Sequence, residues 1–495
     1  MKKITICLVL SLFCLAGFSQ TVTIKGKLAA MSDSSIVLQN AGQFKQELKA
    51  DKTGSFSTSL KVDRGYYFLG KLAILYLSPG MSINIQRSGA DTVITGKGSI
   101  ENNALISLKK TEREYFPMQG RFIASKFNDM EPAEFLKHLE NYKTEASKVL
   151  EQQGMDEQFK SDQKDNIQYT AKHYLNSYRS RYGIDPIKEL EYYKEFQKMA
   201  ASNTVSSDLA TKLLPYMQAM HVKRLSMEDR RKIDAFIWQD FDINKGELFT
   251  FSPNYRTLVT QRLDVLVRAE QSKSPYLANT PASKEEFKMD VADKEIKNEF
   301  IKEFFLFGSA RIAIPGSEDI EKTYSKYNSL AKDLYYLDQI KTLYTNKKLT
   351  STGAVSPQFS FVDIDNKPVS LSSLKGNYVY IDVWATWCVP CIKEIPALKL
   401  LEEKYHSKPI KFVSISVDKL KDKEKWEAYV TSNKLKGIQL FADKDFQSDF
   451  IKAYGINAIP RFILINPEGK IVSPNAQRPS NPRIEETLNE LLGKI

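Results

Sequence analysis

Two cysteines that lie two residues apart carry the clearest chemistry in this sequence. They occur as Cys-Val-Pro-Cys at residues 388–391, after an apolar run at 377–384 that predicts a buried strand and before a helical pattern at 390–405. At such a strand-to-helix junction, the free backbone N–H groups and the helix dipole stabilise a thiolate on Cys388. Cys391 lies one turn later, where its thiol can attack a disulfide on Cys388. The spacing therefore predicts thiol-disulfide exchange, with Cys388 as the nucleophile and Cys391 as the resolving thiol.

Two other uses of this cysteine pair are alternatives. A structural zinc ion needs about four ligands, whereas the histidines of this chain are scattered, at His138, His173, His221 and His406. A purely structural disulfide is the second alternative, although a loop this short constrains the unfolded chain only a little. We expect a redox-active disulfide between Cys388 and Cys391, and no metal site.

The first residues have the pattern of an export signal. Met1-Lys2-Lys3 is followed by an apolar run from Ile4 to Phe18 that is too short to span a bilayer, and Ser19 is a small residue at a plausible cleavage position. We predict a cleaved signal peptide at residues 1–19. Two of the four cysteines would be removed with it, so the mature chain would keep only Cys388 and Cys391.

Cys14 offers a lipid-anchored alternative to simple cleavage. Lipoprotein signals need a small residue before the lipidated cysteine, but Phe13 stands there, so a lipoprotein is not expected. No later stretch has the roughly twenty apolar residues that a transmembrane helix needs. The sequence thus predicts a periplasmic or cell-envelope location with no transmembrane segment after signal cleavage, where disulfides persist.

Three patterns follow the signal along the chain. Apolar residues alternate with polar ones at 20–102, which predicts a small antiparallel β-sandwich or barrel. Helical spacing dominates 103–350 and predicts an all-α region, in which Leu330, Leu334, Leu337, Ile340 and Tyr344 would form one apolar stripe. Strands and helices alternate again at 351–495, which predicts an α/β domain.

The composition is that of a folded protein. Of the 495 residues 42% are hydrophobic and 26% are charged, which excludes a disordered or collagen-like chain. The 71 basic and 60 acidic residues give a net charge of +11. The basic residues alternate with acidic ones along predicted helices and form no arginine-rich block, so no nucleic-acid partner is predicted.

The C-terminal residues resemble a known family. Residues 357–495 are similar to the thioredoxin-fold domains of the TlpA/ResA class of envelope thiol-disulfide oxidoreductases. The matching motifs are Asp382-Val383-Trp384-Ala385-Thr386-Trp387-Cys388-Val389-Pro390-Cys391, Glu394-Ile395-Pro396, Ile459-Pro460 and Asn466-Pro467-Glu468-Gly469-Lys470. Residues 75–83 also resemble an uncharacterised β-domain that often precedes such domains in envelope proteins.

The resemblance implies a role for each matched residue. Asp382 would accept the proton of Cys391, helped by burial that raises its pKa, although it could also serve only as a local hydrogen-bond partner. Glu394 would border the active-site cavity, or be an ordinary exposed glutamate. Trp387 would shield the thiolate. Ile459 and a cis Pro460 would present backbone to an extended client strand.

The resemblance also implies partners and a direction. Disulfide-bearing envelope proteins would be the clients, apocytochrome c being one type known for this class, and an inner-membrane thiol carrier would restore the dithiol. No cofactor is expected. The chain departs from the family in a long proline-rich crossing at residues 472–482, which would alter the rim of the client groove.

Two other functions compete with a disulfide reductase. A peroxiredoxin-like peroxidase would place threonine three residues before the reactive cysteine, whereas Thr386 lies two before Cys388. A binding or scaffolding protein could use residues 21–350 to hold an envelope partner, with the thioredoxin-like domain as an accessory. The intact cysteine pair favours the reductase.

Overall fold

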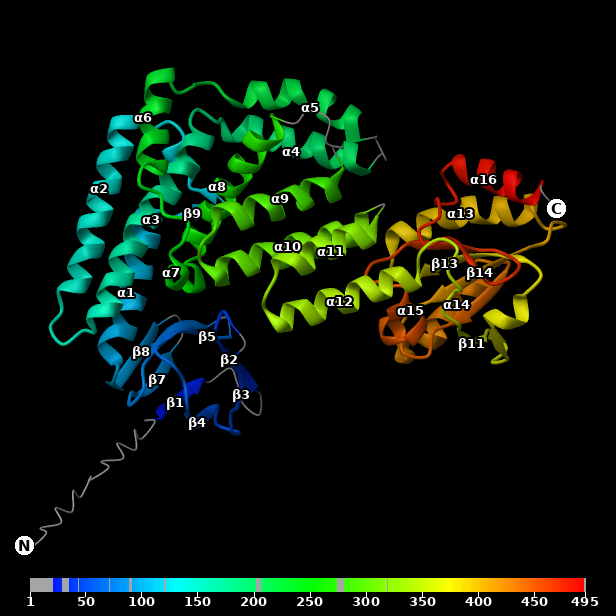
Figure 1. The fold of residues 1–495 in the computed structure, drawn as a ribbon, viewed down its shortest axis with the longest axis horizontal. Helices are drawn as coiled ribbons and strands as arrows, with labels where there is room; N and C mark the ends of the chain where they lie inside the picture. The colour runs from blue at the N-terminus through cyan, green and yellow to red at the C-terminus, as the bar shows by residue number, and fades with distance from the viewer. Residues whose placement is uncertain are drawn as a thin grey trace, which may run out of the picture. The chain divides into compact units, whose positions relative to one another are not determined.

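We describe the chain from a computed structural model, shown as a ribbon in Figure 1. The structure describes residues 21–28, 35–42, 44–70, 72–88, 91–119, 122–201, 206–273, 280–317 and 319–493. The predicted signal peptide, residues 1–19, lies outside the described residues. The chain divides into two compact units, Met1–Leu266 and Val267–Ile495. The limits predicted for the β, helical and thioredoxin-like domains stay predictions.

The first unit begins with two four-stranded sheets, which are blue in Figure 1. One has the strand order β4-β1-β7-β8 and the other the order β3-β2-β5-β6. Alternating apolar side chains, such as Val22 and Ile24 on β1, are fully buried, as period-two patterns predict. The strands are β1 (Val22–Leu28), β2 (Ser35–Gln39), β3 (Lys45–Lys49), β4 (Ser55–Leu60), β5 (Gly65–Leu69), β6 (Ala73–Leu77), β7 (Ser82–Ser88) and β8 (Asp91–Lys97).

The prediction of a purely antiparallel sandwich or barrel is wrong in its pairing. β1 pairs in parallel with β7, with Ile24 opposite Ile83, and the two sheets stay separate among the described residues, so there is no closed barrel. Five strands lie between β1 and β7 along the chain, which supplies the long connection that parallel strands need. Alternation in the sequence reports which face a residue occupies but not the direction of its neighbour, so it could not reveal this pairing.

Helix α1 (Ser99–Tyr115) covers one edge of each sheet. The Asn102 side chain accepts a hydrogen bond from the N–H of Tyr76 on β6 and donates one to its carbonyl, both at 2.9 Å. Asn103 does the same for Ile94 on β8, at 3.1 and 2.7 Å. Two adjacent asparagines thus take the place of a neighbouring strand at two sheet edges.

The rest of the first unit is mainly helical, as predicted, and is cyan to green in Figure 1. A buried polar network ties the second sheet to α3, because Tyr66 on β5 donates to Asp162 at 3.2 Å and accepts from Gln163 at 3.0 Å. The elements are β9 (Met118–Gln119), β10 (Phe122–Ile123), α2 (Pro132–Lys148), α3 (Glu157–Arg181), α4 (Pro186–Ala201), α5 (Ser206–Met220), α6 (Met227–Trp238), α7 (Gly246–Phe251) and α8 (Pro253–Gln271).

The second unit opens with four helices, α9 (Pro281–Glu295), α10 (Glu299–Gly316), α11 (Ile320–Leu330) and α12 (Leu334–Leu349). Leu330, Leu337, Ile340 and Tyr344 share one apolar cluster, as the predicted stripe requires, but the prediction of one continuous helix that includes Leu334 is wrong. The chain turns at Ala331–Asp333, where the Asp333 carboxylate caps α12 by accepting from two backbone N–H groups, and Leu334 is 81% exposed. An aspartate at a helix start accepts hydrogen bonds from the free N–H groups. Asp333 therefore starts a new helix, although the helical spacing of apolar residues continues through it.

A seven-stranded sheet forms the centre of the C-terminal part, in the order β12-β11-β15-β14-β13-β16-β17. Helices α13 and α16 pack on one face through Leu398, Leu401 and Leu488. Helices α14 and α15 supply Trp426 and Phe450 to the core on the other face. The elements are β11 (Ser360–Asp363), β12 (Pro368–Ser370), β13 (Tyr378–Trp384), α13 (Val389–Lys404), β14 (Ile410–Ser416), α14 (Lys423–Ser432), β15 (Ile438–Phe441), α15 (Asp449–Ala453), β16 (Arg461–Ile465), β17 (Ile471–Ser473) and α16 (Arg483–Leu492).

The α/β prediction for this part is confirmed, with additions. The sheet includes three strands that the sequence did not indicate, β11, β12 and β15, which each have four residues or fewer. Runs this short give too few residues to show a period. Across the described part of the chain, no helix is long and apolar enough to cross a membrane.

Candidate active site

The cysteine pair lies at the junction that the sequence indicated. β13 ends at Trp384, and Cys388 is the N-cap residue of α13. Cys388 and Cys391 form a disulfide with an S–S distance of 1.96 Å. The N–H of Cys391 donates to Sγ of Cys388 at 3.2 Å, so a free helix N–H group points at the sulfur expected to carry the thiolate. The two cysteines are 4% and 2% exposed, and burial differs little between them.

Asp382 is buried within β13, the strand that leads into the cysteine loop. Burial, together with the charges of Glu394 and Glu402, raises the pKa of its carboxyl to about 8. Its Oδ1 atom has no hydrogen-bond partner among the described residues. A carboxyl in this setting is protonated over most of the neutral range, and its pKa is close to that of a thiol.

Glu394 lies one turn after Cys391 on α13 and is also buried. It does not behave as an exposed helix glutamate, because it holds the proline-rich crossing. Its carboxylate accepts from the N–H of Ser480 at 3.0 Å and from the Ser480 hydroxyl at 3.1 Å, and it lies 3.7 Å from the Arg478 guanidinium. The segment that departs from the family is thereby fixed to the helix that carries the dithiol.

The Ile459–Pro460 peptide bond is cis, as the sequence predicted. Ile459 packs against the apolar cluster that contains Cys388 and Cys391. Trp387 is 55% exposed, with its ring centroid 6.4 Å from that of Phe446. Ile459 therefore packs against the same cluster as the disulfide, and Trp387 remains accessible to solvent.

A third buried carboxyl, Glu402, lies two turns beyond Glu394 on α13. Burial raises its pKa to about 7, against the opposing charges of Lys399 and Lys436. Its charge is also one of the causes that raise the pKa of Asp382. Within the described ranges, no group of three or more His, Cys, Asp or Glu residues is arranged to hold a metal ion.

Asp418 is a residue of the site that no sequence motif indicated. It is fully buried beyond the end of β14 and accepts from the Thr386 N–H at 2.8 Å, the Thr386 hydroxyl at 2.9 Å and the Ser416 hydroxyl at 2.8 Å. Thr386 is two residues before Cys388, so this carboxylate holds the loop that leads to Cys388. The signal in the sequence was an aspartate directly after the largely apolar run at residues 410–417.

We expect Thr386→Val to loosen this loop. The substitution keeps the side-chain shape but removes the hydroxyl that donates to Asp418, and a hydrogen bond to a buried charge contributes about 1.5–3 kcal/mol. The free energy of unfolding should fall by about that amount in a urea titration, and iodoacetamide should alkylate reduced Cys388 more slowly. Thr386→Ser keeps the hydroxyl and is the matched control. Equal stability of the Val and Ser variants would contradict the role given to Asp418.

Comparison with known proteins agrees with this geometry. A sequence model of the Redoxin family matches residues 351–492. The thiol-disulfide oxidoreductase ResA of Bacillus thuringiensis subsp. konkukian (strain 97-27) is 30% identical over 152 residues, which are 31% of this chain and 83% of the relative. ResA of Bacillus subtilis (strain 168) is 32% identical over 130 residues, 26% of this chain and 70% of the relative.

A solution structure from Bacteroides vulgatus, assigned to the thiol-disulfide oxidoreductases, is also similar to this chain. It is 55% identical, with 30% of this chain and 93% of that chain covered and a TM-score of 0.27.

The fold and the site define a thioredoxin-like protein with a disulfide at a helix N-terminus. The chain belongs, through its C-terminal part, to the ResA family of thiol-disulfide oxidoreductases. It is therefore a disulfide oxidoreductase.

Proposed function

We propose that this protein is exported and reduces disulfides of envelope client proteins. In the reduced form, the Cys388 thiolate attacks one sulfur of a client disulfide. The client S–S bond breaks, one client sulfur leaves as a thiolate that takes a proton from water, and a mixed disulfide joins the client to Cys388. The observation that carries this proposal is the Cys388–Cys391 disulfide at the start of α13.

Cys391 completes the exchange in the second step. Its thiol gives a proton to the Asp382 carboxylate, and the resulting thiolate attacks Sγ of Cys388. The mixed disulfide breaks, the second client sulfur leaves with the electron pair, and Cys388–Cys391 becomes the oxidised pair. The client gains two electrons and two protons in total. Support for Asp382 as the base comes from its burial and its pKa near that of a thiol.

The client groove would lie beside the disulfide. Trp387 and Val389 are 55% and 62% exposed and flank Cys388 in the sequence, so they offer apolar contact to an incoming chain. Ile459 would offer its backbone to an extended client strand. Glu394 would shape the rim of the groove by holding Ser480 and Arg478 in place.

The location and the electron source follow from the same proposal. Residues 1–19 have the pattern of a cleaved signal peptide, which favours a periplasmic or cell-envelope location. Each turnover leaves the disulfide oxidised, so a membrane thiol donor must return two electrons. Reduction of apocytochrome c is one use that the family resemblance suggests.

The reduction potential and insulin reduction together test this function. We expect the full-length protein, reduced beforehand, to cleave the insulin interchain disulfides. Equilibration with glutathione buffers should give a potential in the reductant range, about −200 to −270 mV. A potential near about −120 mV would indicate an oxidant instead. No insulin reduction by the folded dithiol form would contradict the reductase proposal.

A further inference from the structure

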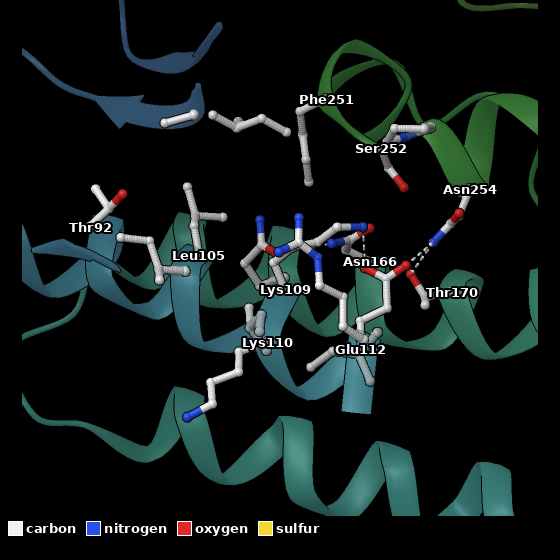
Figure 2. A pocket seen from close by; sticks show the side chains of 18 of the residues that line it. Thr92, Leu105, Lys109, Lys110, Glu112, Asn166, Thr170, Phe251, Ser252 and Asn254 are labelled. Carbon is white, nitrogen blue, oxygen red and sulfur yellow. Dashed lines mark hydrogen bonds and ion pairs between the residues drawn. The ribbon is translucent and has the colours of Figure 1, made fainter. Parts of the chain in front are cut away.

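A cavity of about 940 Å³ lies in the first unit, well away in sequence from the dithiol. Its walls come from β5–β6, β7–β8, α1, α3 and the α7–α8 junction. Figure 2 shows Phe251 pointing into it from one side and Leu105 from another. Cavities of about this size bury most of the surface of a drug-sized ligand. The function proposed above does not use this cavity.

Two sheet edges open onto the cavity. The N–H and C=O of a strand residue point to the same side and alternate along an antiparallel pair. Because Asn102 binds both backbone groups of Tyr76 from outside the sheet, the backbone groups of Ile74 point outward as well. By the same alternation, Asn103 on Ile94 shows that the backbone groups of Thr92 point outward. Ile74 and Thr92 both line the cavity.

These outward backbone groups lack partners in the part of the chain that the structure describes. Neither Ile74 nor Thr92 makes a hydrogen bond there through its outward N–H or C=O. Asn102 and Asn103 bind the backbone groups of Tyr76 and Ile94, two residues after Ile74 and Thr92. Each sheet edge is therefore hydrogen-bonded at the later residue and unpaired at the earlier one. An extended polypeptide carries the alternating donors and acceptors that would complete such an edge.

The residues that line the cavity indicate which kinds of side chain the bound polypeptide should carry. Ten lining residues are apolar, among them Phe68, Ile74, Leu105 and Phe251, so one face of the strand should be apolar. Four basic side chains line the cavity against two acidic ones. Glu112 is already bound by Tyr174, Asn254 and Lys109, whereas Arg113 is exposed and has no ion pair or hydrogen bond with any described residue.

The cavity wall is held in place before any ligand arrives. The Tyr66 ring stacks on Phe251 with centroids 3.7 Å apart, and its hydroxyl is bound to Asp162 and Gln163 on α3. The sheet that contributes β6 is therefore fixed to the helices that complete the cavity. A fixed wall reduces the ordering cost of binding.

We propose that this cavity binds an extended polypeptide segment that alternates apolar and acidic side chains, by strand addition to the outer edge of β6 at Ile74. The apolar side chains would face Phe68 and Leu105, and the acidic ones would face Arg113 and the neighbouring lysines. Binding would need no cysteine chemistry, so this proposal can be tested independently of disulfide reduction.

Fluorescence anisotropy of a labelled, capped peptide in which valine and glutamate alternate tests the proposal. The protein is the full chain with both active-site cysteines replaced by serine, so that no covalent adduct forms. We expect saturable binding, and about tenfold weaker binding of a peptide whose alternate backbone nitrogens are methylated, since one donated hydrogen bond is then lost. No binding of the parent peptide, or equal binding of both peptides, would overturn strand addition.

Two variants locate the site. Ile74→Pro removes the outward N–H while proline is tolerated at a sheet edge, and it should weaken binding about tenfold. Arg113→Glu should weaken binding of the valine–glutamate peptide and strengthen binding of a peptide in which lysine replaces glutamate. The control Lys411→Glu, on β14, should change the affinity for neither peptide. If Ile74→Pro does not fold, as judged by circular dichroism, the Arg113→Glu comparison decides. Unchanged affinity in a folded Ile74→Pro variant, or in Arg113→Glu, would place binding elsewhere.

Discussion

Cys391→Ser should convert the protein from a turnover enzyme into a covalent trap for its clients. Cys388 can still attack a client disulfide, but a serine hydroxyl cannot displace the client sulfur from the mixed disulfide as a thiolate does. Clients should accumulate on Cys388, and catalytic insulin reduction should stop after one attack per molecule. Non-reducing gels of cell-envelope fractions should show slower bands that collapse on addition of reductant.

Two control variants test whether the slower bands depend on Cys388. The Cys388→Ser, Cys391→Ser double variant has no attacking sulfur and should show no slower bands. Cys388→Ser alone removes the sulfur that accepts the helix N–H group and should trap far less than Cys391→Ser. If Cys391 proved to be the sulfur bound to clients, the two assigned roles would be reversed. If the folded, exported Cys391→Ser protein trapped nothing, an accessory or scaffolding role would gain support.

The dithiol and its surroundings could be predicted because their signals are local. A cysteine pair at a strand-to-helix junction needs only the adjacent residues to be recognised, and β13 and α13 begin and end within a residue or two of the expected limits. The cis Ile459–Pro460 bond followed from the family resemblance. The roles of Asp382, Glu394 and Trp387 remain proposals.

What could not be predicted depends on contacts between distant residues. The parallel pairing of β1 with β7 leaves no trace in the alternation of either strand. Asp418 binds Thr386 across 32 positions, so only the fold brings them together. The hydrogen bonds that Ser480 donates to Glu394 span 86 positions. They explain why Glu394 is buried, whereas the sequence allowed either a residue at the border of the cavity or an exposed glutamate.

We propose that the buried Asp382 supplies the proton transfer that the cysteines alone cannot. A thiol held in an apolar core loses its proton only if a base lies nearby, and the base is useful near neutral pH only if its pKa is raised. Burial, with the charges of Glu394 and Glu402, raises the pKa of Asp382 to about 8. Asp382 is therefore suited to accept the Cys391 proton in one direction and to return it in the other.

Asp382→Asn should slow resolution of the mixed disulfide by about 100-fold near pH 8, since a positioned base contributes about 10²–10⁴-fold. Attack by Cys388 should change little, because the carboxylate acts on Cys391. In the wild type, the resolution rate should rise with pH up to about 8, the pKa of Asp382, and then level off. In the variant this inflection should disappear. Stopped-flow tryptophan fluorescence with a model disulfide separates the two steps. Equal slowing of both steps would show that Asp382 is structural.

The stability of the oxidised protein gives an independent readout of the same carboxyl. Burial places the folded-state pKa, about 8, above the ordinary value of 3.8, so the folded state binds the proton more tightly than the unfolded state. The contribution of Asp382 to stability should then be complete below pH 3.8 and be lost as the pH rises through about 8, by about 1.4 kcal/mol per pH unit between these two values. The amide of the Asp382→Asn variant does not titrate. The free energy of unfolding of the variant should therefore rise relative to that of the wild type between pH 3.8 and about 8. Urea titrations that give a difference independent of pH would show that Asp382 has an ordinary pKa and cannot serve as the base.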